Sequence, residues 1–441
     1  MRMLHSGRSG FGIPVLLGLA LLAAPPAVQA QETAGEREIT FTRDVAPLIH
    51  RSCSGCHRPD EVAPMSLITY EEVRPWARSI RNRVESREMP PWHIDRRIGI
   101  QDFKDDPSLS DAEIATIVGW LDAGAPRGNP EDMPPLPQYA SADDWQIGEP
   151  DLIVRYPNYV VPAAGPDLFG SLYADVGLEE DRYIRAVQTK PADKKARLVV
   201  HHTNAYLTAP GDITEGVESE RHLVEYASGK QAEIYPEDSG VLLQAGSQTR
   251  LSYHLHSVGE DIDTVIDMGI VLHPKGTVPK HVRWTKQLAG AHGTIAGLVD
   301  LPPGQVTRTD GYTRFSKAAR ITMFQPHMHM LGKYQCLELI YPTQPVTSEV
   351  VNCAHFDYNW HLAYNYSDDS APLVPAGTIL HVINWHDNTA AHRANPDPRN
   401  WTGSGGRTID EMGFAWIGWY DLTDEEYEAE LAEREARRRT I

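Results

Sequence analysis

The chain has 441 residues, of which 41% are hydrophobic and 23% charged, and its formal net charge is −19. This composition is that of a globular protein with enough apolar residues for a core, and the length predicts two to four domains. The strong negative charge argues against a role in binding nucleic acid or anionic membrane surfaces.

Residues 1–30 are predicted to be a secretory signal rather than part of the fold. Arg2 and Arg8 precede an apolar run over residues 11–24, and the tripeptide Val-Gln-Ala at 28–30 has the small residues of a cleavage site. The run is short for a membrane span, and an uncleaved anchor is the alternative. We therefore expect an exported protein, periplasmic or extracellular, with no stable membrane insertion after signal cleavage.

Residues 53–57 read Cys-Ser-Gly-Cys-His, the attachment motif of a c-type haem. Cys53 and Cys56 would bind the haem covalently, and His57 would be an axial iron ligand. A redox dithiol or half of a zinc site is the alternative, but a zinc ribbon would need a second such cysteine pair.

The second axial ligand is predicted to be Met89, which two prolines hold in an extended loop, with Met65 as the competing candidate. Paired methionine and histidine ligands are an electron-transfer arrangement. Helices are expected at residues 41–50, 70–85 and 111–123. The segment 39–128 resembles a small class I cytochrome c, and we expect it to be an all-α domain.

After a Pro-rich linker at 129–150, the pattern changes to short β-branched and aromatic runs between Gly, Pro and Asp turns. This predicts two all-β sandwich domains, jelly-roll-like, at 151–279 and 280–422, and then a charged helix at 423–441. Strands are expected at 151–156, 182–188, 197–207, 249–257, 264–272, 321–330, 336–342, 350–358, 378–385 and 411–421.

Of the four cysteines, two lie in the second β-rich region. Cys336 and Cys353 lie at the ends of a segment that is predicted to form two strands. Export favours a disulfide between them, and two buried thiols are the alternative.

His327 and His329 lie two residues apart in Phe-Gln-Pro-His-Met-His-Met-Leu-Gly-Lys. On a strand both would point to the same side, so both imidazoles could bind one copper, zinc, iron or nickel ion. Met412, in Asp-Glu-Met before an aromatic strand, offers a soft thioether ligand that favours Cu(I). Histidines and a methionine that only fill the core are the alternative.

His201 and His202 are adjacent, so on a regular strand they would point to opposite faces. They can share a metal ion only if the strand is distorted or their donor atoms lie nearly opposite each other, with a third ligand from another strand. His254 and His256 are the candidates for that ligand. The alternative is one core histidine beside one exposed histidine.

In their order along the chain these groups resemble the copper type II, ascorbate-dependent monooxygenase family, of the peptidylglycine α-hydroxylating and dopamine β-monooxygenase kind. The resemblance covers about residues 181–420. It implies two copper ions, one bound by three histidines and one by two histidines and a methionine. The implied ligands are His201, His202 and His254 for the first copper, and His327, His329 and Met412 for the second. The resemblance favours His254 over His256, because His254 lies five residues before Gly259, as a histidine does in the family pattern.

The resemblance implies that the three-histidine copper passes an electron and that dioxygen reacts at the other copper. We therefore expect an enzyme that hydroxylates a C–H bond of a small substrate with O2. Electrons would come from an external redox protein or an ascorbate-like reductant through the haem. A non-catalytic haem and copper electron-transfer or copper-binding protein is the alternative.

The sequence departs from the family pattern at three positions. Gln325 stands where peptidylglycine enzymes have an arginine that binds the substrate carboxylate, Trp416 replaces a tyrosine, and Ser252 replaces a glutamine. We therefore do not expect a C-terminal glycine peptide as the substrate, and an apolar or aromatic small molecule is equally compatible.

Overall fold

The computed structural model describes residues 37–59, 61, 63–138, 144–210, 221–227, 232–290 and 299–440. The predicted signal at 1–30 and part of the linker at 129–150 lie outside these ranges. The residues from Ile39 onward form one compact unit. Within the described ranges, none of the helices has both the length and the apolar character that crossing a membrane requires.

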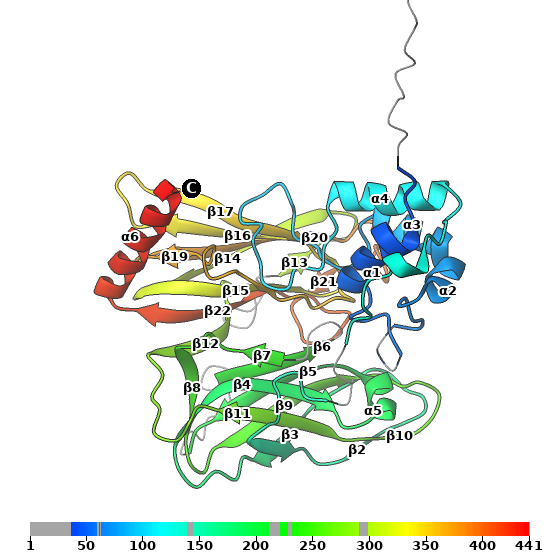
Figure 1. The fold of residues 1–441 in the computed structure, drawn as a ribbon. Coiled ribbons are helices and arrows are strands. Elements are labelled where there is room, and N and C mark those ends of the chain that lie inside the picture. The colour runs from blue at the N-terminus through cyan, green and yellow to red at the C-terminus, as the bar shows by residue number, and fades with distance from the viewer. Residues whose placement is uncertain are drawn as a thin grey trace, which may run out of the picture. The chain divides into compact units, whose positions relative to one another are not determined.

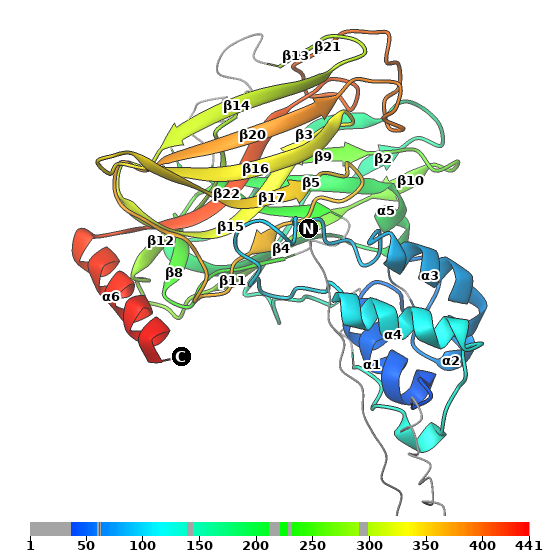
Figure 2. The ribbon, with the colours of Figure 1, turned by 90° about the horizontal axis from the view of Figure 1, so that it is seen from above.

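The three helices predicted in the N-terminal segment are confirmed, and Figure 2 shows α1 to α4 grouped together. The second is divided into three pieces around Pro75, which has no backbone N–H to donate. Side chains such as Phe41, Ile49 and Trp120 form the buried core of this helical segment. The helices are η1 (Phe41–Val45), α1 (Ala46–Ser52), α2 (Tyr70–Val73), η2 (Arg74–Trp76), α3 (Ala77–Glu85), α4 (Asp111–Asp122) and η3 (Pro130–Asp132).

The rest of the chain is mostly β-sandwich, so the protein combines a few N-terminal helices with a large β part (Figure 1). The first group of strands is β1 (Leu152–Arg155), β2 (Tyr159–Val161), β3 (Leu168–Asp175), β4 (Arg182–Pro191), β5 (Val200–Thr208), β6 (Arg221–Ala227), β7 (Ala232–Ile234), β8 (Ser239–Leu243), β9 (Gln248–Leu255), β10 (Ile262–Thr264) and β11 (Ile266–Leu272). The second group is β12 (His281–Leu288), β13 (Asp300–Leu301), β14 (Val306–Arg314), β15 (Ala318–Met328), β16 (Gly332–Tyr341), β17 (Thr347–His355), β18 (Tyr364–Asn365), β19 (Leu373–Val374), β20 (Ile379–Asp387), β21 (Thr402–Gly403) and β22 (Gly413–Leu422), followed by helix α6 (Asp424–Thr440).

One ten-stranded sheet includes strands from both predicted sandwich domains. Eight strands follow the order β1-β11-β4-β8-β12-β22-β15-β18, and β7 and β19 pair with β4 and β15 outside this order. Strand β12 joins the two parts of the sheet. Its residues His281 and Val282 pair with β8, and Arg283–Leu288 pair with β22. A four-stranded sheet, β3-β9-β5-β6, shares a buried cluster with the first part, and another, β14-β20-β16-β17, shares a cluster with the second.

The predicted strand at 197–207 is wrong in its first three residues. Lys194–Val199 is helix α5, and β5 begins only at Val200. The carboxylate of Asp193 accepts the backbone N–H of Ala196 at 2.9 Å and thereby caps the helix. A helix of only six residues is too short for its 3.6-residue period to stand out in the sequence.

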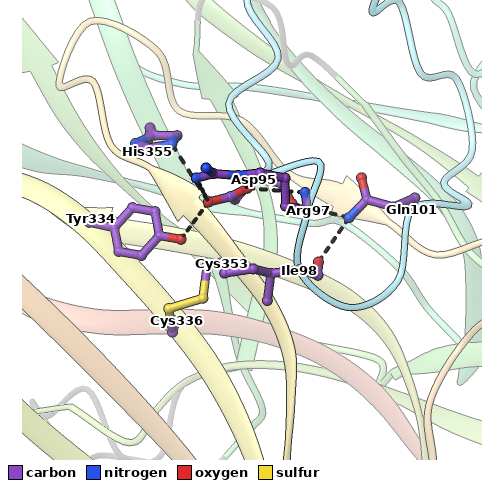
Figure 3. The surroundings of a disulfide bond; sticks show 8 residues. All are labelled: Asp95, Arg97, Ile98, Gln101, Tyr334, Cys336, Cys353 and His355. Atoms are coloured by element: carbon purple, nitrogen blue, oxygen red, sulfur yellow. Dashed lines mark hydrogen bonds and ion pairs between the residues drawn. A yellow bond between two sulfur atoms is a disulfide. The ribbon is translucent and has the colours of Figure 1, made fainter. Parts of the chain in front are cut away.

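The predicted disulfide between Cys336 and Cys353 is present, and it joins directly opposed residues of β16 and β17 (Figure 3). The segment after α3 crosses this strand pair. Its Asp95 donates a backbone hydrogen bond to the Cys353 carbonyl at 2.8 Å and accepts one from the Tyr334 hydroxyl at 2.9 Å. Ile94 is therefore buried in the same cluster as residues of β16 and β17, although it belongs to the predicted cytochrome segment.

We expect a Cys336→Ala/Cys353→Ala variant to lose about 3 kcal/mol of unfolding free energy, because the disulfide closes a loop with a sequence separation of 17. Denaturant unfolding without reductant measures the difference. With dithiothreitol present, the wild type and the variant should unfold at nearly the same midpoint. Equal midpoints without reductant would show that the bond does not stabilise the fold.

Candidate metal centre

A β-bulge brings His201 and His202 to the same side of their strand. In the pairing of β5 with β9, Val200 lies opposite Leu255 and His202 lies opposite His254, so the register shifts between Val200 and His202. A bulge of this kind inserts one residue and re-aims its side chain. The distortion that the sequence required for a shared metal ion is therefore present at His201.

The three histidines predicted for the first metal site come together. His201, His202 and His254 each offer a ring nitrogen, and these atoms lie within 4.8 Å of one another. The Nδ1 atoms of His201 and His202 are 3.1 Å apart. His256 is not in this group, and its ring centre is 6.1 Å from that of His201. Of the two candidates for the third ligand, the geometry favours His254.

The outer nitrogen of His254 is fixed by a carboxylate. Its Nε2 lies 3.0 Å from Oδ2 of Asp167, whereas its buried Nδ1 has no hydrogen-bond partner in the described parts of the chain. A metal-binding histidine typically donates its other ring N–H to a carboxylate or carbonyl, which sets the tautomer. His254 therefore has the arrangement of a ligand that binds through Nδ1.

Burial keeps these imidazoles neutral at ordinary pH. Burial and then the neighbouring histidines lower the pKa of His201 to about 4. The same causes, burial first, hold the pKa of His202 well below its usual value, and burial also lowers that of His254. A neutral imidazole has the free lone pair that a metal ion needs, so protons compete weakly for this group near neutral pH.

His327 and His329 lie near each other, with ring centres 5.5 Å apart. His327 is in β15, whereas His329 follows the last residue of that strand, so the expected strand over 321–330 ends two residues early. The Nδ1 atom of His329 lies 3.1 Å from the Asp410 carbonyl oxygen, which leaves Nε2 as the candidate ligand atom. Burial lowers the pKa of His329 as well.

Glu411 holds the turn that follows this histidine pair. The carboxylate is fully buried and accepts the backbone N–H groups of His329, Leu331 and Met412. Its other close neighbour is Nδ1 of His386, at 3.7 Å. The Asp-Glu-Met motif thus positions His329 through both the Asp410 carbonyl and the Glu411 carboxylate.

Met412 lies immediately before β22 and packs against a cluster that contains Tyr206, Phe414 and Trp416. His327 stacks on Phe414 with ring centres 4.4 Å apart. The thioether therefore belongs to the apolar wall beside the histidine pair, and its role as a metal ligand stays a prediction.

Sequence reasoning missed a sixth histidine that lies between the two groups. The His361 ring centre is 5.0 Å from that of His202 and 5.6 Å from that of His327. His361 comes from the loop between β17 and β18 and is only 3% exposed. It stands alone in Asn-Trp-His-Leu, with no spacing to another histidine that could have marked it.

Gln325 and Trp416, two of the residues at which the sequence differs from the pattern of the family it resembles, lie beside the histidines. The Gln325 side-chain amide donates a hydrogen bond to the buried Glu225 carboxylate. The Trp416 ring packs against His222 with ring centres 4.3 Å apart and a tilt of 32° between the ring planes. Where peptidylglycine enzymes have a substrate-binding arginine, this chain therefore has a neutral amide that is bound to Glu225. Gln325 offers no positive charge to the carboxylate of a substrate.

The residues of the haem motif fit the predicted cofactor. Cys53 and Cys56 are both free thiols, and Nδ1 of His57 lies 3.3 Å from the Met65 carbonyl oxygen, as suits a histidine that binds iron through Nε2. The Met65 side chain packs against the same helical core as Cys53. Met89 instead lines a cavity of about 970 Å³. The choice between the two methionines stays a prediction.

No protein-family model matches the chain, and no curated protein matches it. Among solved structures, it is similar to the major capsid protein P2 of bacteriophage PM2, with 10% identity, a TM-score of 0.25 and coverage of 62% of this chain and 98% of that one. N-glycanase F gives 11% identity, a TM-score of 0.25 and coverage of 62% and 96%. Values this low do not define a family.

We expect Asp167→Asn to weaken copper binding by the three-histidine group about tenfold or more, because a ligand's outer hydrogen-bond partner typically contributes 10–100-fold to affinity. Titration against a Cu(I) chelator measures the effect. Asp175→Asn is the matched control, because Asp175 ends β3, the strand that Asp167 immediately precedes, and bonds only to Gln248 among the contacts described for its side chain. Equal losses in both variants would contradict a role for Asp167 at the site.

Proposed function

We propose that this protein is an exported copper-dependent monooxygenase that hydroxylates a C–H bond of a small substrate with O2. The observation that carries this proposal is the convergence of His201, His202 and His254 at the bulge in β5. The second histidine pair lies close by, because the His361 ring centre is 5.0 Å from that of His202 and 5.6 Å from that of His327. Buried neutral imidazoles are suitable copper ligands.

The donor atoms divide into three sites. His201, His202 and His254 would hold one copper, and His327, His329 and Met412 would hold the other. Cys53, Cys56 and His57 would hold a c-type haem, with Met89 as the second iron ligand. Bound copper supplies one-electron chemistry with dioxygen, so that C–H becomes C–OH, the second oxygen atom leaves as water, and two electrons and two protons are consumed.

The chain's own residues orient the ligands and limit access of water. Asp167 and the Asp410 carbonyl fix the rings of His254 and His329. Both rings are less than a tenth exposed. These contacts pre-organise the ligands before any metal ion binds, which reduces the cost of ordering them.

The surroundings of the histidine pair suit a neutral, apolar substrate. Met323, Phe414 and Trp416 are buried next to Met412. Gln325 is bonded to Glu225, so the position offers no cation to an anionic group. We therefore propose an apolar or aromatic small molecule as the substrate, with an external redox protein or an ascorbate-like compound as the electron donor.

We expect Met412→Ile to abolish most turnover while the protein keeps its fold, haem and most of its copper. A thioether is a weak donor that tunes reactivity, and the replacement is similar in volume, so its packing cost should stay below about 1.5 kcal/mol. Oxygen uptake by the reduced protein, measured against a panel of small C–H substrates, should fall by orders of magnitude.

The control in that experiment is the wild type with the same copper content. Normal turnover by Met412→Ile would show that Met412 only fills the core. If the wild type binds both coppers and the haem yet consumes no oxygen with any substrate, the protein is an electron-transfer or copper-binding protein instead.

We also expect one covalent haem per chain, shown by a c-type pyridine haemochrome spectrum. Met89→Ala should lose the methionine–iron charge-transfer absorption of the oxidised protein, whereas Met65→Ala should keep it. The reverse result would assign the axial position to Met65, whose carbonyl already faces His57.

A further inference from the structure

His361 has the surroundings of a metal ligand rather than of an ordinary core histidine. Its Nδ1 faces Oε1 of Glu225 at 3.4 Å, and both side chains are almost fully buried. Its Nε2 is buried without a hydrogen-bond partner among the residues that the structure describes. A core histidine normally has both ring nitrogens satisfied, so this unpaired atom requires an explanation.

The Glu225 carboxylate supplies the outer contact that metal-binding histidines usually make. It lies on β6 and also accepts a hydrogen bond from Gln325, two residues before His327. A carboxylate held in this way selects the tautomer of His361 with the proton on Nδ1, which leaves the lone pair on Nε2. The unpaired nitrogen is therefore the one that could bind a metal ion.

The number of imidazoles at each site, rather than the spacing of the rings, indicates which metal site lacks a ligand, because His361 is also 5.0 Å from His202 of the first group. In the three-histidine group the ring centres are 4.8, 5.0 and 5.4 Å apart. His327 is 5.5 Å from His329 and 5.6 Å from His361, which are similar distances. The first group already has three imidazoles, whereas the second has two.

We propose that His361 is a third imidazole ligand of the copper held by His327 and His329, binding through Nε2, with Glu225 as its positioning residue. This inference rests on the proposed copper sites, but it does not depend on turnover. It changes the second site from two histidines and a methionine to three histidines, with Met412 as an additional weak donor.

The test uses the full-length haem protein in a His201→Ala/His254→Ala background, which removes the three-histidine site and leaves one copper. In this background, His361→Gln should weaken Cu(I) binding at least about tenfold, measured by chelator competition. X-ray absorption should show one imidazole fewer per copper. Glu225→Gln should weaken binding while the imidazole count stays unchanged.

His222→Gln is the matched control, because His222 is a nearby buried histidine whose Nε2 lies 3.0 Å from Asn204 Oδ1. It should keep both the affinity and the imidazole count. If His361→Gln behaves like this control, the proposal is wrong, whatever the wild type does with oxygen.

If the His201→Ala/His254→Ala variant does not fold, the number of imidazoles per copper is measured by X-ray absorption on the protein with both copper sites intact. His361→Gln should then lower the mean number of imidazoles per copper, and an unchanged number would overturn the proposal. A wild type that binds copper through His361 but hydroxylates nothing would contradict the monooxygenase function and leave this ligand assignment standing.

Discussion

The convergence of His201, His202 and His254 depends on one extra residue in strand β5. Without the register shift at His201, a regular strand would send its imidazole away from His202 and from the facing His254. Because of this shift, the ring nitrogens of the adjacent residues His201 and His202 lie close enough together to bind one metal ion. The third donor needs no distortion, because His254 lies directly opposite His202 in the sheet.

Hydrogen-bond acceptors then hold the imidazoles in place, and of these the Glu225 carboxylate is buried whereas the Asp167 carboxylate is exposed. Asp167, Glu225 and the Asp410 carbonyl each face one histidine, and Glu411 holds the backbone of the turn after His327. A buried carboxylate without partners would strongly destabilise the fold, so Glu225 and Glu411 have to be satisfied locally. For these two residues, the contacts that position the histidines also satisfy the buried carboxylates.

The sequence predicted the features that have a clear local pattern, and it failed where the pattern was too short to recognise or where a residue matters only through distant contacts. The helices around the haem motif, the approximate positions of the ten strands that were expected and the pairing of Cys336 with Cys353 followed from periodicity, spacing and export. Helix α5 was missed because six residues show little period. His361 could not be found, since its significance comes only from Glu225 and from histidines that lie far away in sequence.

The shared ten-stranded sheet has a consequence for how the protein denatures. Strand β12 pairs with β22 over Arg283–Leu288 but with β8 only at His281 and Val282, so a bridge of two residue pairs joins the two parts of the sheet. Separation of the two halves requires this short bridge to open. We therefore expect the unfolding of the two halves to be coupled as long as these two pairs stay intact.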